Sequence, residues 1–363
     1  MTHLDLTAPV EELAKALVDI PSVSGNEDRI ADAVEAALAP LAHLDVIRLG
    51  NAIVARTDLG RAERVVIAGH LDTVPIKGNV PGEWSPEGEL VGRGSVDMKA
   101  GVAVQLSLAA ALESPTRDIT WVFYDQEEVE AVRNGLGRVA RERPDLVAGD
   151  FAVLCEPTSG VIEGGCNGTM RAEIRIPGRA AHSARAWKGE NAIHRAAPLL
   201  AALAAYEAET ITVDGLEYRE GINAVGIAGG IAGNVIPDEC IVTVNYRFAP
   251  CWTLEQAQER LEGLVASAGL DRYALTYTDL SGAARPGLDA PLAASFAASV
   301  AATGVAAPRA KQGWTDVARF GELGIPAVNY GPGDPELAHA DDERCPVSDI
   351  RNCRAGLEAW LTS

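Results

Sequence analysis

The sequence predicts an α/β protein with a mixed, mainly parallel sheet flanked by helices, interrupted by a smaller inserted α+β domain. Two observations predict this fold. Short, almost unbroken apolar runs lie near residues 65–68, 119–124, 151–154 and 326–330, as expected for strands covered on both faces. Between residues 169 and 279 the strands instead alternate apolar and polar residues. We therefore expect a first domain at 1–168 and 280–363, and an inserted domain at 169–279.

Helices are expected to cover the sheet of the first domain. Apolar residues recur at helical spacing near the N-terminus and again from about Glu27 to Leu38. The segment Met98–Leu112 is rich in alanine and apolar nearly all round, which indicates a buried helix.

The inserted domain shows a different order of elements. An alternating strand at 169–176 is followed by a helical pattern at 190–208 and by strands near 222–228 and at 240–247. A second helical pattern at 254–268 and a strand near 273–278 complete the series. The resulting order, strand-helix-strand-strand-helix-strand, is typical of a ferredoxin-like unit.

Composition and charge narrow the classes of function. The net charge of −20 argues against a nucleic-acid partner and against an anionic membrane surface. No run approaches 18 consecutive apolar residues, and the first twenty residues lack a signal pattern. The six cysteines are scattered, so we expect reduced packing residues in a cytoplasmic protein.

Side chains that bind metals or move protons gather after the apolar runs. They are His70 with Asp72, Glu127 with Glu128, Glu156 and His339, joined by Asp97 just before the long buried helix. Ligands of open α/β sheets gather beyond the carboxyl ends of the strands. Two imidazoles and several carboxylates, with no cysteine, suit one or two divalent cations that activate water. The pattern indicates a metal-dependent hydrolase.

Each of these residues also has an ordinary structural interpretation. A lone histidine after a strand is usually a packed residue, Asp97 could cap a helix, and adjacent glutamates could be solvated. The spacing of His70 and Asp72 adds one specific expectation. On extended backbone their side chains point the same way, so Asp72 can accept a hydrogen bond from the far ring nitrogen. Coincidence at every strand end is improbable.

The chain resembles the co-catalytic zinc amidohydrolases, the family of aminoacylase, acetylornithine deacetylase and carboxypeptidase G. Five motifs carry the resemblance: Gly69-His70-Leu71-Asp72, Ser95-Val96-Asp97-Met98, Asp125-Gln126-Glu127-Glu128, Cys155-Glu156-Pro157 and Leu337-Ala338-His339. It implies a zinc exopeptidase-like fold, a cis peptide at Asp97-Met98, and two Zn²⁺ per subunit that Co²⁺ or Mn²⁺ could replace. Asp97 would bridge the cations, His70 and Glu156 would complete one site, and Glu128 and His339 the other. Glu127 matches the general base.

The resemblance also assigns roles to the inserted domain. Residues 169–279 would close over the substrate as a lid and form a homodimer. His182 would reach across the dimer to stabilise the oxyanion. The residues that would bind substrate are Arg247, Asn234, Arg185, Gly313 and Thr315. Arg185 replaces a tyrosine of the best-known relatives, and Gly313-Trp314-Thr315-Asp316 departs from their Gly-Thr-Ser-Asp.

Segments 311–320 and 331–339 resemble family members that act on a small anionic N-acyl amino acid. The implied reaction hydrolyses N-succinyl-LL-2,6-diaminopimelate to succinate and LL-2,6-diaminopimelate. N-acetylornithine and other N-acyl amino acids are alternative substrates, because the same metal ligands serve all of them. A catalytically silent binding protein on this scaffold is the alternative from another class. Glu127 argues against it, since a binder needs no general base.

Overall fold

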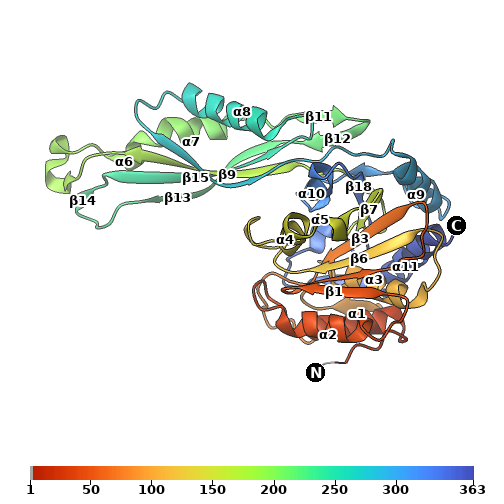
Figure 1. Cartoon of the computed structure of the whole chain (residues 1–363). Helices are drawn as coiled ribbons and strands as arrows, with labels where there is room; N and C mark the ends of the chain where they lie inside the picture. The colour runs from red at the N-terminus through yellow and green to blue at the C-terminus, as the bar shows by residue number, and fades with distance from the viewer. Residues whose placement is uncertain (1–2) are drawn as a thin grey trace. The chain divides into compact units, whose positions relative to one another are not determined.

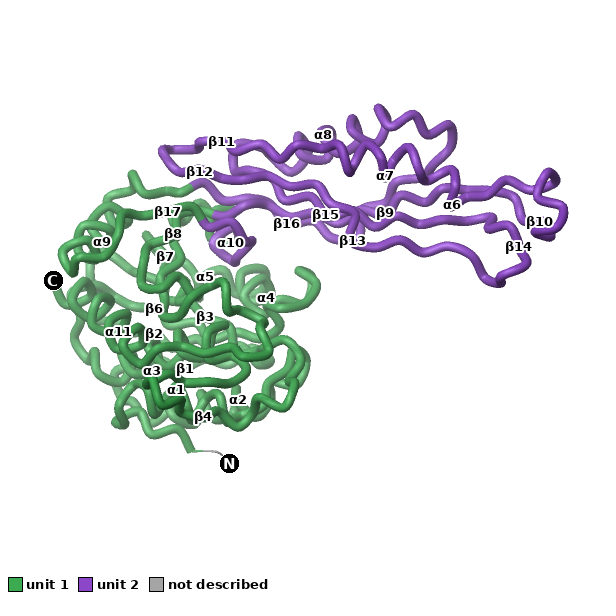
Figure 2. The backbone as a smooth tube through the Cα atoms, turned by 180° about the vertical axis from the view of Figure 1, so that it is seen from behind, with its two compact units in different colours: residues 1–165, 286–310, 319–363 green, residues 166–285, 311–318 purple. Residues whose placement is uncertain are grey.

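The structure, a computed structural model, describes residues 3–363 and divides into two compact units, which Figure 2 distinguishes. Unit 1 runs to residue 165 and continues through 286–310 and 319–363, and unit 2 comprises 166–285 and 311–318. The junctions fall three residues before and six residues after those expected, and 311–318 joins unit 2. Local pairing explains this division. Cys166 forms a bridge with Ala284, and the Trp314 indole donates a hydrogen bond to the Gly282 carbonyl over 3.0 Å.

Eight strands form the central sheet of unit 1, in the order β1-β2-β6-β3-β7-β18-β8-β17. Their bounds are β1 (Asp45–Leu49), β2 (Ala52–Arg56), β6 (Asp118–Tyr124), β3 (Arg64–His70), β7 (Phe151–Leu154), β18 (Ala327–Asn329), β8 (Glu163–Gly164) and β17 (Arg309–Ala310). The four central strands, β6, β3, β7 and β18, are parallel to one another. Their carboxyl ends therefore meet at one edge of the sheet.

Helices lie on both faces of this sheet (Figure 1). Their bounds are α1 (Val10–Val18), α2 (Asp28–Leu38), α3 (Lys99–Ala111), α4 (Gly135–Glu142), α5 (Pro144–Val147), α9 (Pro291–Ala301) and α11 (Val347–Leu361). Helices α1, α3 and α11 pack together, and α9 joins them through α11, whereas α4 and α5 contact β6 outside that core. The short helix α10 (Val317–Glu322) spans the junction near residue 318.

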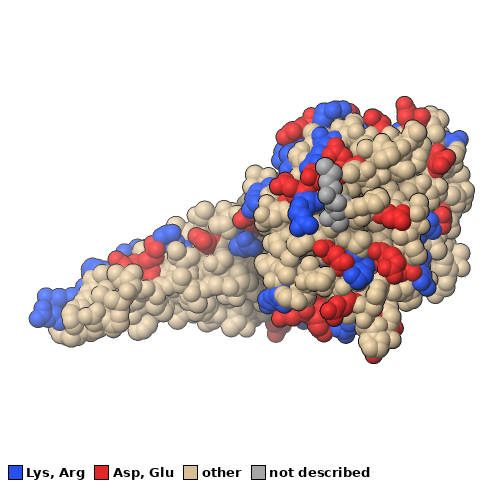
Figure 3. Space-filling model, turned by 90° about the horizontal axis from the view of Figure 1, so that it is seen from below, with Lys and Arg blue, Asp and Glu red and all other residues tan. Residues whose placement is uncertain are grey.

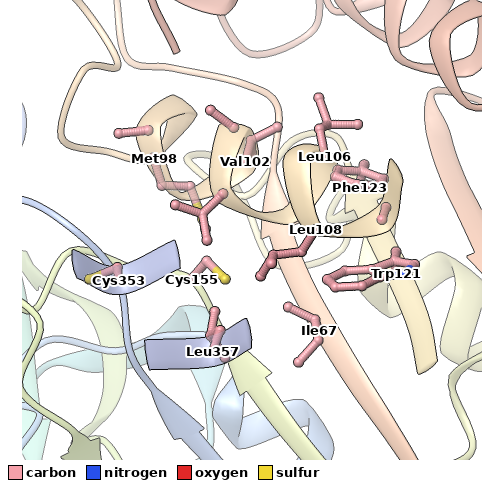
Figure 4. Close-up of a cluster of buried hydrophobic side chains, with 14 of the residues drawn as sticks. Ile67, Met98, Val102, Leu106, Leu108, Trp121, Phe123, Cys155, Cys353 and Leu357 are labelled. Atoms are coloured by element: carbon pink, nitrogen blue, oxygen red, sulfur yellow. The ribbon is translucent and has the colours of Figure 1, made fainter. Parts of the chain in front are cut away.

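Helix α3 is apolar all round because neighbours surround it. It contacts β3 and β6 on one side and α1 and α11 on others. Figure 4 shows this core, with labelled side chains Ile67, Met98, Val102, Leu106, Leu108, Trp121, Phe123, Cys155, Cys353 and Leu357. Full burial of a large apolar side chain contributes on the order of 1.5–3 kcal/mol. This packing holds the start of α3 firmly beside the ends of the parallel strands.

A small three-stranded sheet borders the same region of unit 1. Its strands are β4 (Glu83–Trp84), β5 (Glu89–Val91) and β19 (Arg344–Pro346), in the order β19-β5-β4, all antiparallel. The 3₁₀ turn η2 (Pro335–Leu337) precedes β19 along the chain. The pairing of β5 with β19 brings the segment after residue 91 close to the segment before residue 344.

Unit 2 is built on a four-stranded antiparallel sheet in the order β13-β15-β9-β16. Its elements are β9 (Gly168–Pro177), β10 (Ala181–His182), η1 (Ser183–Lys188), α6 (Ala192–Arg195), α7 (Ala197–Ala204), β11 (Thr210–Val213), β12 (Leu216–Arg219), β13 (Gly221–Gly229), β14 (Val235–Ile236), β15 (Glu239–Phe248), α8 (Leu254–Ser267) and β16 (Ala274–Ser281). Helices α7 and α8 contact each other, and their apolar residues share a core with the sheet. With the two small two-stranded sheets, β10–β14 and β11–β12, set aside, this is the predicted ferredoxin-like order.

The predicted fold class is confirmed. The sheet of unit 1 is mixed and parallel at its centre, and the long helix expected at 98–112 forms at Lys99–Ala111. The sequence patterns did not predict the β11–β12 hairpin, which extends unit 2 beyond the ferredoxin-like unit. Each of its short strands carries a single buried residue, Val213 in β11 and Tyr218 in β12, among intermediate and exposed ones, so the apolar signal is weak.

Candidate metal centre

The carboxyl ends of the parallel strands supply most of the centre. Strand β3 ends at His70, which is almost fully buried, and β7 is followed by the buried Glu156. After β6 the chain turns at Gln126, whose φ of 59° lies in the left-handed region. Such a turn is uncommon outside glycine and often occurs at functional sites. It presents Glu127 and Glu128 at the same edge.

Asp97 reaches this edge from the loop before α3. The Asp97–Met98 peptide is cis, as the resemblance implied. Gly101, in the first turn of α3, permits the approach. A Cβ at that position would lie 2.1 Å from the Cys155 carbonyl oxygen, so any larger residue collides with the main chain. The start of α3 therefore lies directly against the end of β7, which brings Asp97 beside Glu156.

Three groups of ligand atoms form here, each with its atoms within 4.8 Å of one another. The groups are His70 with Asp97 and Glu156, Asp97 with Glu128 and His339, and His70 with Glu127 and Glu128. Asp97 belongs to two of them. One carboxylate oxygen of Asp97 lies 3.0 Å from His70 Nε2, and the other lies 3.3 Å from His339 Nε2. His339 Nε2 is also 2.9 Å from Glu128 Oε1.

Asp72 supports the centre from behind. Its Oδ1 accepts the Glu127 amide over 3.0 Å, and its Oδ2 accepts the Glu128 amide over 3.1 Å. The Ser24 hydroxyl donates to Oδ2 over 2.7 Å. His70 Nδ1 lies 3.1 Å from the Asp72 carbonyl and 3.5 Å from its carboxylate, so the nearer partner is the main chain. Asp72 thus orients both His70 and the glutamate pair.

The pKa shifts show that this centre favours positive charge. Burial disfavours the imidazolium of His70, but hydrogen bonds with Asp72 and Asp97 outweigh it and raise its pKa. The pKa of His339 rises to about 10, because Asp97 and Glu128 both accept from its ring. Burial, and then repulsion from Asp97, raises the pKa of Glu128. Because both of their pKa values are raised, the two imidazoles hold protons that divalent cations would displace.

The donor set fits two divalent cations. The three groups contain the carboxylates of Asp97, Glu127, Glu128 and Glu156, together with two imidazoles. Most of these side chains are buried or half-buried, and burying several like charges without a countercharge is costly. Nitrogen and oxygen donors without sulfur suit zinc and neighbouring divalent metals. Geometry, charge and donor type agree.

Comparison with known proteins places the chain in a family. The family described as "Peptidase family M20/M25/M40" matches residues 66–363. The chain belongs to peptidase family M20/M25/M40. A protein of Mycobacterium tuberculosis called "Putative succinyl-diaminopimelate desuccinylase DapE" is 53% identical over 348 residues, covering 96% of each chain. A Corynebacterium glutamicum "Succinyl-diaminopimelate desuccinylase" is 44% identical over 364 residues, covering 99% of this chain and 98% of its own.

Solved structures of the M20 family share the fold. A Staphylococcus aureus tripeptidase is 21% identical and has a TM-score of 0.81, with 99% of this chain and 98% of that chain covered. A Bacillus subtilis protein described as a "Dinuclear Metal Binding Peptidase from M20 Family" is 16% identical, with a TM-score of 0.69 and coverage of 97% and 96%. The M20 fold therefore extends over both units of this chain.

The residues expected to bind substrate belong to unit 2 and form two groups. The first group lies where β10 pairs with β14, with His182 opposite Val235. His182 is exposed, and its Nδ1 accepts the Ala184 amide over 3.0 Å. Arg185 follows on η1, and the Asn234 carbonyl accepts the Ser183 amide over 2.9 Å. The structure brings these three predicted residues together.

The second group comprises Arg247, Gly313 and Thr315, and Arg247 lines an open pocket of about 500 Å³. Its lining residues are Asn167, Thr210, Glu217, Arg219, Glu220, Gly221, Arg247 and Gln312. Arg247 lies on β15 and donates to the Asn245 side chain over 3.2 Å. Gly313 is exposed just after Gln312, whereas Thr315 is buried and its carbonyl accepts a hydrogen bond from Cys166. Of the predicted residues, Arg247 alone lines the pocket.

Charge and cysteine placement complete the description. On the face shown in Figure 3, Lys and Arg lie interspersed with Asp and Glu. Among residues 3–363, no helix is both long enough and apolar enough to cross a membrane. All six cysteines are free, five of them buried, and no group of metal-binding side chains found in that range contains one.

Sequence patterns missed several supporting residues. Ser24 contacts Asp72 from 48 positions away, and nothing near Ser24 marks it as functional. Arg93 and Glu343 form a buried ion pair beside the centre, although 250 residues separate them. A charged residue between two glycines, Gly92 and Gly94, was the one available signal for Arg93.

Proposed function

We propose that this chain is a di-zinc amide hydrolase that cleaves N-succinyl-LL-2,6-diaminopimelate to succinate and LL-2,6-diaminopimelate. The main support for this proposal is that Asp97 belongs to two groups of ligand atoms, as a bridging ligand would. Glu127 lies close to His70 and Glu128 in the third group. The names of the relatives at 53% and 44% identity support the choice of substrate. A cytoplasmic location would suit the six free cysteines, since reducing compartments keep thiols reduced.

The proposed centre assigns one role to each ligand. Asp97 would bridge the two cations, with His70 and Glu156 on the first and Glu128 and His339 on the second. Zn²⁺ at these positions would supply Lewis acidity, which lowers the pKa of water and polarises the amide carbonyl. Co²⁺ or Mn²⁺ could take the same donors. The amide of Glu128 is held by Asp72, which fixes the start of its side chain.

Glu127 would carry the protons. Its carboxylate takes one proton from the attacking water as the water oxygen bonds to the amide carbon. When the carbon–nitrogen bond breaks, Glu127 delivers that proton to the leaving amine. Succinate and the free amine are the two products, and Glu127 returns to its ionised state. The hydrogen bond from its main-chain amide to Asp72 holds Glu127 in place while its side chain moves a proton.

Recognition of the anionic substrate would fall to unit 2. Arg247 and Arg219 line the same open pocket together with Glu217 and Glu220, so the pocket offers two guanidinium groups to an anion without a net positive charge. A guanidinium pairs with a carboxylate through two parallel hydrogen bonds. His182 would stabilise the oxyanion, and Asn234 and Arg185 would contact the substrate from the β10–β14 region.

The spacing of the two groups within unit 2 favours a homodimer. Strand β15 carries Arg247 near its end, while its start at Glu239 follows the β10–β14 region. Eight residues of extended strand separate these positions, roughly 26 Å at 3.3 Å per residue. An amino-acid-sized substrate does not span that distance. If both groups act on one substrate, a second copy must supply one of them.

An exposed sheet edge offers the surface for this dimer. Strand β13 is one of the two edge strands of the four-stranded sheet, and Val225 and Ile227 on it are 59% and 54% exposed. Ile193 of α6 and Ile231, just after β13, are also exposed. An uncovered apolar edge strand is an aggregation hazard, and pairing with a second copy removes it. We assign the dimer interface to this edge.

A mixing experiment tests the dimer and the role of His182 together. Glu127→Gln and His182→Ala variants are purified, shown to be inactive alone, then unfolded, mixed and refolded. If His182 acts across the dimer, half of the sites in mixed dimers are complete, so activity recovers to about a quarter of the wild-type value. If it acts within its own chain, no site is complete. An inactive mixture that sediments as a dimer would overturn the cross-subunit role.

A side-by-side assay tests the substrate. The zinc-loaded enzyme is given N-succinyl-LL-2,6-diaminopimelate and N-acetylornithine under the same conditions, and kcat/KM is compared. We expect the succinyl compound to be preferred, because its additional carboxylate can pair with an arginine. Preference for N-acetylornithine would replace the proposed substrate, and turnover of neither would favour a silent binding protein.

A further inference from the structure

A buried ion pair lies beside the candidate centre but contributes no ligand. Arg93 Nη1 is 2.9 Å from Glu343 Oε2, and the two side chains are 3% and 1% exposed. Removing both charges from water is costly, and apolar residues of similar volume often stabilise a core equally well. Stability is therefore a weak explanation for the pair. Its other contacts indicate a more specific role.

Glu343 holds the main chain that carries Asp97. Its Oε1 accepts the amides of Val96 and Asp97 over 2.9 and 3.0 Å. In addition, the Glu343 carbonyl accepts the Gly92 amide over 2.9 Å. The segment from residue 92 to 97 is thus tied to Glu343 at three points. These bonds fix the position from which the Asp97 carboxylate faces both His70 and His339.

Arg93 holds the segment that carries His339. The same Nη1 that contacts Glu343 also donates to the Ala340 carbonyl over 3.1 Å. His339 has a φ of 65°, in the left-handed region, where the backbone of a residue other than glycine is strained. Such a conformation persists only where surrounding contacts impose it. The bond to Ala340 is one such contact, directly after the strained residue.

We propose that Arg93 and Glu343 are positioning residues, which set the separation of Asp97 and His339 and thereby form the second cation site. The pair connects the loop before α3, which carries Asp97, to the loop before β19, which carries His339. These two ligands form the second site together with Glu128. The first site shares Asp97, but its other two ligands, His70 and Glu156, lie at strand ends that the pair does not contact, so it depends on the pair less. The inference rests on the proposed two-cation centre.

The test measures cation binding rather than turnover. Metal-free protein is titrated with Zn²⁺ by calorimetry, and bound zinc is counted by elemental analysis. For Arg93→Leu and Glu343→Gln we expect the affinity of the second cation to fall at least ~10-fold, the lower range for groups that orient metal ligands. The affinity of the first cation should change by less than about three-fold, since its strand-borne ligands stay in place.

A matched control separates positioning from folding. Asp118 is also a buried carboxylate that accepts two main-chain amides, from Leu59 and Arg61, and lies 3.7 Å from an arginine, Arg64. It stands at the start of β6, at the opposite end from the centre. Asp118→Asn should lower the thermal midpoint of the metal-free protein and leave both cation affinities unchanged.

A double variant addresses the case in which the single variants misfold. Arg93→Met with Glu343→Leu removes both buried charges. This double variant should fold more readily than either single variant, which leaves one buried charge unpaired. We expect it to bind the second cation as weakly as the single variants. Wild-type affinity for that cation in this variant would overturn the inference while leaving the two-cation centre intact. A wild-type protein that binds one cation alone would overturn both.

Discussion

The two units place their functional side chains in different ways. In unit 1 the candidate ligands follow parallel strands, and their atoms gather within 4.8 Å of one another in three groups. In unit 2 the residues expected to bind substrate lie on antiparallel strands and short turns, in two groups at opposite ends of β15. Parallel strands present all their carboxyl ends at one edge, whereas an antiparallel sheet divides its ends between two edges.

This difference bears on whether the metal ligands of unit 1 and the expected substrate-binding residues of unit 2 can each work within one chain. A centre formed at one sheet edge is assembled by the fold of a single unit. In unit 2 the expected residues are divided between the ends of an antiparallel sheet, and the proposed homodimer would bring the two groups to one substrate. Changes in unit 1 should therefore act on the cations and on proton transfer, whereas a change in unit 2 should act on substrate recognition.

Removal of the cations should have the largest effect. Dialysis of the purified enzyme against a chelator should abolish hydrolysis of the N-succinyl substrate, and added Zn²⁺ should restore it, because water activation depends on Lewis acidity. The thermal midpoint should fall at the same time, since ligands that bind the folded state stabilise it. Full activity in protein shown by elemental analysis to be free of metal would contradict the proposed centre.

Glu127→Gln should come next. Loss of the proton acceptor should lower kcat by roughly 10²- to 10⁴-fold, the usual contribution of general acid–base catalysis. Zinc content should stay at the wild-type level, because Glu127 is assigned no cation. Glu128→Gln is the matched control and should lose the second cation. If Glu127→Gln loses zinc instead, the roles of the two adjacent glutamates are reversed.

The strand ends could be predicted because their sequence signals are local. Unbroken apolar runs marked β3, β6 and β7, and His70, Glu127 and Glu156 followed them within a few positions. The parallel arrangement of the strands then made proximity a consequence of topology. The resemblance added what patterns could not, including the cis peptide after Asp97.

What could not be predicted depends on contacts between distant segments. Ser24 reaches Asp72, and Arg93 reaches Glu343, through tertiary packing that leaves no periodic trace in the sequence. The expected bond from His70 to Asp72 is formed mainly with the main-chain carbonyl, because the carboxylate is occupied by two amides and a hydroxyl. The junctions between units shifted for a similar reason, since 311–318 joins unit 2 through hydrogen bonds made across the chain.

Arg247→Lys tests recognition in unit 2 with a moderate expected effect. Lysine keeps the charge but loses the planar fork that pairs with a carboxylate through two bonds. We expect KM to rise roughly 10-fold, equivalent to about 1.4 kcal/mol, with a smaller change in kcat. Arg219→Lys, which lines the same pocket, is the control and should raise KM less. Equal effects of the two changes would show that the pocket contributes charge without a specific pair.

Ser24→Ala should have the smallest effect and sharpens the account of unit 1. The change removes one of the three donors to the Asp72 carboxylate, a hydrogen bond of 2.7 Å, and should cost about 1 kcal/mol of stability. Because the same carboxylate holds the amides of Glu127 and Glu128, kcat should fall a few-fold while KM stays constant. Ser107→Ala is the control, since Ser107 accepts a bond of 2.8 Å from Arg354 far from Asp72. It should lower stability without changing kcat. If Ser24→Ala behaves in the same way, the two amides alone fix Asp72, and the orientation of the glutamates depends on the turn at Gln126.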